Sequence, residues 1–178
     1  VDDDHIVIIE GNWYGNDHTG LFPPFDDNMI YSFHHYIGGS TDTTTMYRQY
    51  RTDISVEYDV PLWVGEFGEN SNYWGNNIKS FFERNDIGWS WWNYKSVERI
   101  SSLFSYEITD GYQVLLDYWQ GGGSKPDTIV AFESLVSLAN SIKFDSCKVN
   151  KDLIRALTDS TYNSTSIPFT TFSPPGLL

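Results

Sequence analysis

Cysteine and long apolar runs are scarce in this sequence of 178 residues, and each scarcity excludes a class of protein. The single cysteine, Cys147, cannot form an internal disulfide, and no paired cysteine or histidine spacing indicates a metal site. No run of about 18 apolar residues occurs, which is the length that a membrane-spanning helix needs. We therefore expect no metal, no cofactor and no membrane as a partner.

Positive charge is also in short supply, since 11 Lys and Arg face 24 Asp and Glu for a net charge of −13. An acidic chain repels the phosphate backbone, so nucleic-acid binding is not expected. Aromatic residues are abundant instead, at 17% of the chain with 7 Trp and 12 Tyr. Such side chains stack on flat ligands, and the charge favours sugar rings over bases.

The first half of the chain alternates apolar segments with helical patterns, which predicts parallel βα units. Strands are predicted over residues 5–10, 29–36, 62–66 and 87–95, and helices over 42–58 and 70–85. Asp42 or Thr43 is predicted to cap the first helix. The loop over residues 11–27 is rich in Gly, Asn, Asp and Pro, and no helix is predicted there.

The second half of the chain no longer alternates predicted strands with predicted helices. Residues 97–106 are predicted to form a loop with a helical turn, followed by helices over 112–119 and 126–142 and a last helix capped by Asn150. We predict one domain over residues 1–157. Residues 158–178, rich in Ser, Thr and Pro, are predicted to form a linker or tail.

Reactive side chains stand at or near the ends of the four predicted strands, and the carboxyl ends of barrel strands meet at one mouth. These side chains are Glu10, His34, Tyr36, Glu66, Trp92 and Lys95. A glutamate beside stacking aromatics would make a sugar site. Because neighbours alternate across a strand, His35 is expected to face away from His34, and Trp91 away from Trp92.

Four motifs in order resemble glycoside hydrolase family 5, the cellulase and β-glucanase family. They are Ile8–Asn12, Tyr31–Tyr36, Pro61–Gly68 and Gly88–Lys95. The resemblance covers about residues 4–142 and implies an α/β fold, the (β/α)8 TIM barrel, of which this chain would supply the last four βα units as a half-barrel. It also implies retaining hydrolysis of β-1,4-type glucan by two glutamates.

The same resemblance implies roles for particular residues. Glu66 resembles the nucleophile at the end of the seventh strand, and His34 and Tyr36 resemble the His-x-Tyr pair of the sixth. Trp92 resembles the platform under the sugar that is cleaved. Glu10 and Trp13 are expected to line the cleft without a fixed role, and Lys95 is expected at its rim.

The chain departs from the family in one large respect. It contains no Asn-Glu-Pro motif, which carries the general acid/base of the family, and the first four strands have no counterpart. We therefore expect a processed or truncated chain that meets an N-terminal half-barrel in the same or another chain. Secretion or export to the periplasm is expected. The alternatives are a non-catalytic carbohydrate-binding protein and a self-associating half-barrel.

Overall fold

A computed structural model describes residues 4–36, 47–97 and 99–162. This part of the chain forms two compact units. The first unit is Val1–Trp92 with Ile154–Leu178, and the second is Asn93–Leu153. The second unit is therefore an insertion in the sequence of the first.

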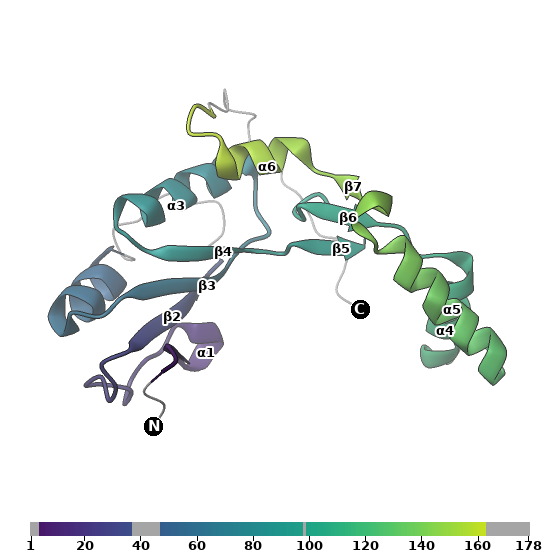
Figure 1. Cartoon of the computed structure of the whole chain (residues 1–178), viewed down its shortest axis with the longest axis horizontal. Coiled ribbons are helices and arrows are strands. Elements are labelled where there is room, and N and C mark those ends of the chain that lie inside the picture. Colours follow the sequence, from purple (N-terminus) through teal and green to yellow (C-terminus); the bar gives the residue numbers. More distant parts are fainter. Residues whose placement is uncertain (1–3, 37–46, 98, 163–178) are drawn as a thin grey trace. The chain divides into compact units, whose positions relative to one another are not determined.

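A parallel sheet forms the centre of the first unit (Figure 1). In the described residues it contains β1 (Val7–Glu10), β2 (Met29–His35), β3 (Leu62–Gly68) and β4 (Gly88–Trp92), in that order across the sheet. The predicted parallel βα arrangement is confirmed. Neighbours in sequence are neighbours in the sheet, as in a barrel.

Aromatic side chains from the helices cover one face of this sheet. The helical elements of the unit are η1 (Tyr47–Val56), α3 (Asn72–Arg84) and most of α6 (Lys151–Thr158). Tyr50 of η1 stacks on Phe33 with ring centres 3.8 Å apart, and Trp74 of α3 stacks on His35 at 5.6 Å. Phe33 and His35 are two residues apart on β2, so alternation leaves His34 on the opposite face.

Helix α3 begins where its sequence supplies a cap. The Ser71 hydroxyl accepts a hydrogen bond from the Trp74 amide at 3.2 Å, which satisfies one of the free donors of the first turn. The predicted helix over 42–58 corresponds to η1. Its proposed caps, Asp42 and Thr43, lie outside the described residues.

The loop after β1 contains a short turn that the sequence did not predict. Element α1 (Asn12–Gly15) is a single turn with left-handed backbone: φ is 54° at Trp13, 56° at Tyr14 and 75° at Gly15. The prediction of no helix over 11–27 is therefore wrong at these four residues. Residues other than Gly and Asn seldom adopt this left-handed backbone conformation, so the amino-acid composition of the loop gives no signal for it.

The second unit combines short strands with a helical hairpin (Figure 1). Its elements are β5 (Lys95–Val97), β6 (Phe104–Tyr106), α4 (Asp110–Trp119), α5 (Thr128–Ser141), η2 (Phe144–Ser146) and β7 (Lys148–Val149). The helices agree with those predicted, and the Asp127 carboxylate caps α5 by accepting from the Ile129 and Val130 amides, each at 2.9 Å. Within 97–106, where a loop with a helical turn was predicted, the Ser102 amide donates to the Arg99 carbonyl at 3.3 Å and closes a turn, but β6 at the end of the segment was not predicted. Strands of two or three residues are too short to show a period.

The apolar face of α5 is largely uncovered. Ile129 is 71% exposed and Phe132 is 67% exposed, although both recur at helical spacing. The pattern thus predicted the helix but not a partner for its apolar side.

A helix that crosses a lipid bilayer needs about 20 predominantly apolar residues. Within residues 4–36, 47–97 and 99–162, no helix has both the length and the apolar character to cross one. Of the predicted tail, residues 163–178 lie outside the described part.

Candidate active site

Glu66 reaches the open face of the sheet because β3 is irregular just before it. Leu62 and Val64 are buried on the helix-covered face, so strict alternation would also turn residue 66 to that face. Phe67 is buried there instead, with its ring 5.1 Å from that of Phe82, while the side chain of Glu66 is 31% exposed.

The pairing of β2 with β3 shows the cause. Phe33 pairs with Val64, but the next residue, His34, pairs with Glu66, so Gly65 is an extra residue in β3. Such a bulge re-aims the side chain that follows it. A glycine leaves room here, because a Cβ at position 65 would lie 2.7 Å from the Ser32 Oγ and would require that hydroxyl to move.

Three side chains then converge on the open face. The Tyr36 hydroxyl donates a hydrogen bond to Glu66 Oε2 at 2.8 Å, and His34 Nδ1 lies 3.4 Å from the same oxygen. Burial, together with the hydrogen bond to Glu66, raises the pKa of the Tyr36 phenol. Tyr36 therefore stays a neutral hydrogen-bond donor to the Glu66 carboxylate.

Glu10 joins this cluster from β1. Its Oε1 lies 3.2 Å from His34 Nε2, so the imidazole stands between two carboxylates. The side chain of His34 is 12% exposed, compared with 47% for Glu10. Neighbouring strands thus bring together Glu10, His34, Tyr36 and Glu66, four of the residues singled out in the sequence.

The two candidate aromatics near the cluster are exposed. Trp92 is 43% exposed, whereas Trp91 is 8% exposed and packs edge-on against Phe67 at 5.0 Å. Trp13 is 78% exposed on the left-handed turn after β1. These rings are therefore free to meet a ligand, as stacking on a sugar requires.

Lys95 is not at the end of β4. The predicted strand over 87–95 is too long: β4 ends at Trp92, and Lys95 begins β5 in the second unit. There its ammonium donates a hydrogen bond to the Ile142 carbonyl at 2.6 Å. Its role in substrate binding stays a prediction.

A pocket lined in part by Tyr36 contains Tyr14, which sequence reasoning did not propose as a site residue. It is lined by Tyr14, Tyr36, Gly68, Glu69 and Asn70. Tyr14 and Glu69 both have left-handed backbone, with φ of 56° and 52°. The Gly-rich end of β3 was a signal for this turn, but nothing in the sequence pointed to Tyr14.

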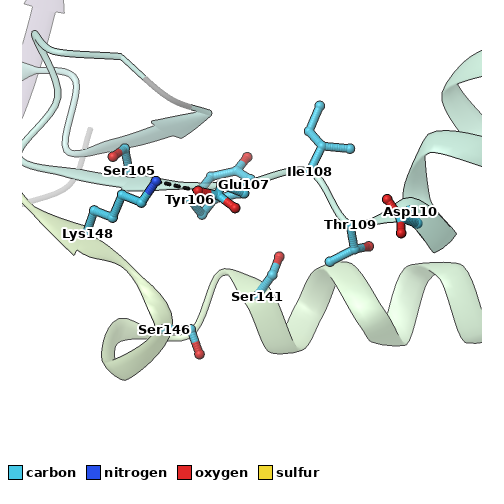
Figure 2. A pocket seen from close by; sticks show the side chains of 9 residues that line it. All are labelled: Ser105, Tyr106, Glu107, Ile108, Thr109, Asp110, Ser141, Ser146 and Lys148. Carbon is cyan, nitrogen blue, oxygen red and sulfur yellow. Dashed lines mark hydrogen bonds and ion pairs between the residues drawn. The ribbon is translucent and has the colours of Figure 1, made fainter.

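The second unit has a polar pocket of its own (Figure 2). It is lined mainly by hydroxyl groups, and its one ion pair joins Lys148 to Glu107. That ammonium group lowers the pKa of Glu107 below its usual range. This carboxylate is therefore already paired with an ammonium group, and no histidine is among the residues that line the pocket.

No group of three or more His, Cys, Asp or Glu side chains in the described residues is arranged to hold a metal ion. The cluster of Glu10, His34, Tyr36 and Glu66 can nevertheless act on a substrate in one clear way. It presents a carboxylate oxygen contacted by a phenol and an imidazole, and the exposed indoles of Trp92 and Trp13 stand at or just after the ends of β4 and β1. That arrangement suits nucleophilic attack on a bound sugar.

Comparison with known proteins identifies one family. The model of cellulase, glycosyl hydrolase family 5, matches residues 1–98, which include the whole cluster. No curated protein matches the chain.

The solved structures that resemble the chain include two endoglucanases. One is the catalytic domain of Thermobifida fusca endoglucanase Cel5A, with 18% identity and a TM-score of 0.47 over 87% of this chain and 47% of that one. The other is an endo-beta-1,4-glucanase from Xanthomonas axonopodis pv. citri, with 15% identity and a TM-score of 0.41 over 73% and 48%. The chain spans about half the length of each.

Proposed function

The chain belongs to glycosyl hydrolase family 5, the cellulase family, and from this we propose that it forms part of a retaining β-glucanase in which Glu66 is the nucleophile. The substrate we propose is a β-1,4-linked glucan, and the action is that of an endoglucanase. The observation that carries the proposal is the placement of Glu66 on the open face of the sheet. There its Oε2 accepts a hydrogen bond from the Tyr36 hydroxyl at 2.8 Å.

The reaction we propose has two steps. Glu66 attacks the anomeric carbon, and the bond from that carbon to the glycosidic oxygen breaks as a partner acid protonates the leaving oxygen. Water then attacks the glycosyl ester and gives its proton to the same partner, and Glu66 leaves as a carboxylate. Tyr36 and His34 keep the attacking oxygen in place.

The partner acid must come from outside the described cluster, and we propose that an N-terminal half-barrel supplies it. The sheet supports this proposal. Strand β1 pairs only with β2 among the described residues, and Ile6 and Ile8 beside that edge are each 59% exposed. Further strands on this edge would cover both side chains and close the barrel.

Trp92 is proposed as the platform for the sugar that is cleaved, with Trp13 at a more distant position. Both side chains are exposed. Trp92 ends β4 and Trp13 follows the end of β1, so both stand at the carboxyl ends of strands, as Glu10 and Glu66 do. Because polymeric glucan cannot enter a cell, we also propose that the enzyme is exported.

The test is to label the nucleophile. The full-length enzyme is incubated with an activated 2-fluoro cellobioside, which slows the second step, and the labelled peptide is mapped by mass spectrometry. We expect the label on Glu66. Label on Glu10 or Glu69, or inversion at the anomeric carbon seen by product NMR, contradicts the proposal.

The Glu66→Gln variant provides the kinetic counterpart. It keeps the size of the side chain and removes the nucleophilic oxygen, so turnover should fall by about 10³-fold or more with little loss of sugar binding. Glu69→Gln serves as the matched control and should cost far less.

A second candidate function follows from the exposed aromatics. A carbohydrate-binding or self-associating half-barrel would keep Trp92 and Trp13 but need no acid. Such a protein would bind cello-oligosaccharides equally well before and after Glu66→Gln and would release no sugar when the N-terminal half is added.

A further inference from the structure

The contact between Glu10 and His34 is not used by the two-step reaction. Three adjacent strands contribute one side chain each: Glu10 comes from β1, His34 from β2 and Glu66 from β3. His34 Nε2 lies 3.2 Å from Glu10, and Nδ1 lies 3.4 Å from Glu66. The ring is therefore held at both nitrogens.

This double contact fixes the direction of the imidazole ring. A half-turn about the bond from Cβ to the ring would replace both nitrogens by carbons and lose both contacts. Only an imidazole with a proton on each nitrogen can donate to both carboxylates at the same time. Without Glu10, the Nδ1 contact to Glu66 alone would set the ring.

Glu10 is itself held by the left-handed turn that follows it. A Cβ at Gly15 would lie 3.1 Å from the Glu10 Cγ, so the turn packs directly on the stem of this side chain. Gly15, Trp13 and Tyr14 all have positive φ. Such conformations persist where the surrounding structure requires them, and they gather at functional sites.

We infer that Glu10 is a positioning residue that holds the His34 ring in the orientation that meets Glu66. The inference rests on the proposed function of Glu66. It assigns Glu10 a role that acts through His34, in place of the cleft-lining role expected from the sequence. When Glu66 becomes the glycosyl ester, His34 loses a charged neighbour. Glu10 takes no part in that ester bond, so its contact with Nε2 keeps the ring in place until the carboxylate of Glu66 is released.

The kinetic test compares Glu10→Ala with Glu10→Gln in the full-length enzyme, with an aryl β-cellobioside as the probe. We expect Glu10→Ala to lower kcat by about 10- to 100-fold, because small misplacement near the nucleophile is costly, and to leave KM within about 2-fold. Glu10→Gln should restore kcat to within about 3-fold of wild type, since its amide oxygen still accepts from Nε2. Glu57→Gln, an exposed carboxylate elsewhere in the unit, is the control and should change neither constant.

The second measurement is independent of turnover. Nitrogen-15 NMR of the histidine rings should show a change at His34 in Glu10→Ala and wild-type signals at His35, which lies on the other face. An unchanged His34 signal overturns the inference, as does a raised KM with unchanged kcat or a Gln variant as slow as the Ala variant. If Glu66→Gln keeps wild-type turnover, the proposed function fails, and the NMR result still decides the role of Glu10.

Discussion

Two adjacent histidines on β2 show how strongly the environment of one residue depends on its face. His34 lies among carboxylates on the open face, whereas His35 is buried against the Trp74 ring at 5.6 Å. Burial lowers the pKa of His35 to about 4. Strand alternation alone separated them, which is why the sequence predicted this difference.

His35 makes the stability of the fold depend on pH. Its pKa is about 4 in the folded state and about 6.5 when unfolded, so between these values the unfolded chain binds more protons. The free energy of unfolding is therefore at its full value above about pH 6.5 and falls as the pH drops toward 4, by roughly 3 kcal/mol at most. Urea unfolding of the full-length protein at several pH values measures this.

The His35→Phe variant keeps an aromatic ring on Trp74 and removes the titration, so the slope of stability with pH should flatten over this window. His5→Gln changes an exposed histidine and should leave the slope as in wild type. Part of the slope remains in His35→Phe, because burial also lowers the pKa of His18. An identical slope in His35→Phe and wild type would contradict the assignment.

The exposure of Trp92 carries a binding prediction. Trp92→Ala should weaken cello-oligosaccharide binding by about 1–3 kcal/mol, the scale for losing a stacked aromatic. Tryptophan fluorescence or calorimetry measures the affinity. Ile100→Ala removes another exposed apolar side chain, in the second unit, and should leave affinity unchanged. Equal binding by Trp92→Ala and wild type would remove this ring from the site.

At the scale of elements, the bulge in β3 is what the sequence could not predict in full. The apolar run to Glu66 predicted the strand, and the two glycines marked an unusual strand end. Counting from Val64, however, alternation places Glu66 on the buried face. Its true face depends on the pairing with β2, which is a long-range contact.

Gly65→Ala tests the bulge directly. The new methyl group would lie 2.7 Å from the Ser32 Oγ and 3.3 Å from His34 Nε2, so these side chains or the strand must shift. We expect a loss of about 1–3 kcal/mol in the free energy of unfolding together with reduced turnover. Gly111→Ala in α4 is the matched control, because its nearest neighbour is 3.7 Å away and alanine favours helix, so stability should hold or rise by up to about 1 kcal/mol. Equal effects of the two variants would argue against a special role for position 65.

Other elements were predicted to the extent that their signals are local. Apolar residues at helical spacing identified α3 and α5, because such a period depends on a few neighbouring residues. The turn α1 and the strands β5 and β6 depend on left-handed backbone or on very short pairings, and these leave no pattern in the sequence.

At the scale of the whole molecule, we expect that the 178-residue chain alone is not a stable monomer. The outer edge of β1 has no strand beside it in the described ranges, and Ile6 and Ile8 are each 59% exposed. An open edge with apolar side chains promotes association. Sedimentation should show dimers or larger species, and addition of an N-terminal half should give one defined complex. A monodisperse monomer with a cooperative thermal transition would contradict this.

The insertion between β4 and α6 has a consequence for synthesis on the ribosome. Helix α6 packs in the first unit, where the Ala156 carbonyl accepts a hydrogen bond from Asn76 at 2.8 Å and Leu157 is buried. Yet the part of α6 that belongs to the first unit, from Ile154 on, is translated only after all of Asn93–Leu153. The sheet that carries Glu66 therefore has no α6 packed on it until the whole of the second unit has been synthesised. During that interval the nascent chain exposes apolar surface that is prone to aggregation. Slower translation within the insertion makes the interval longer.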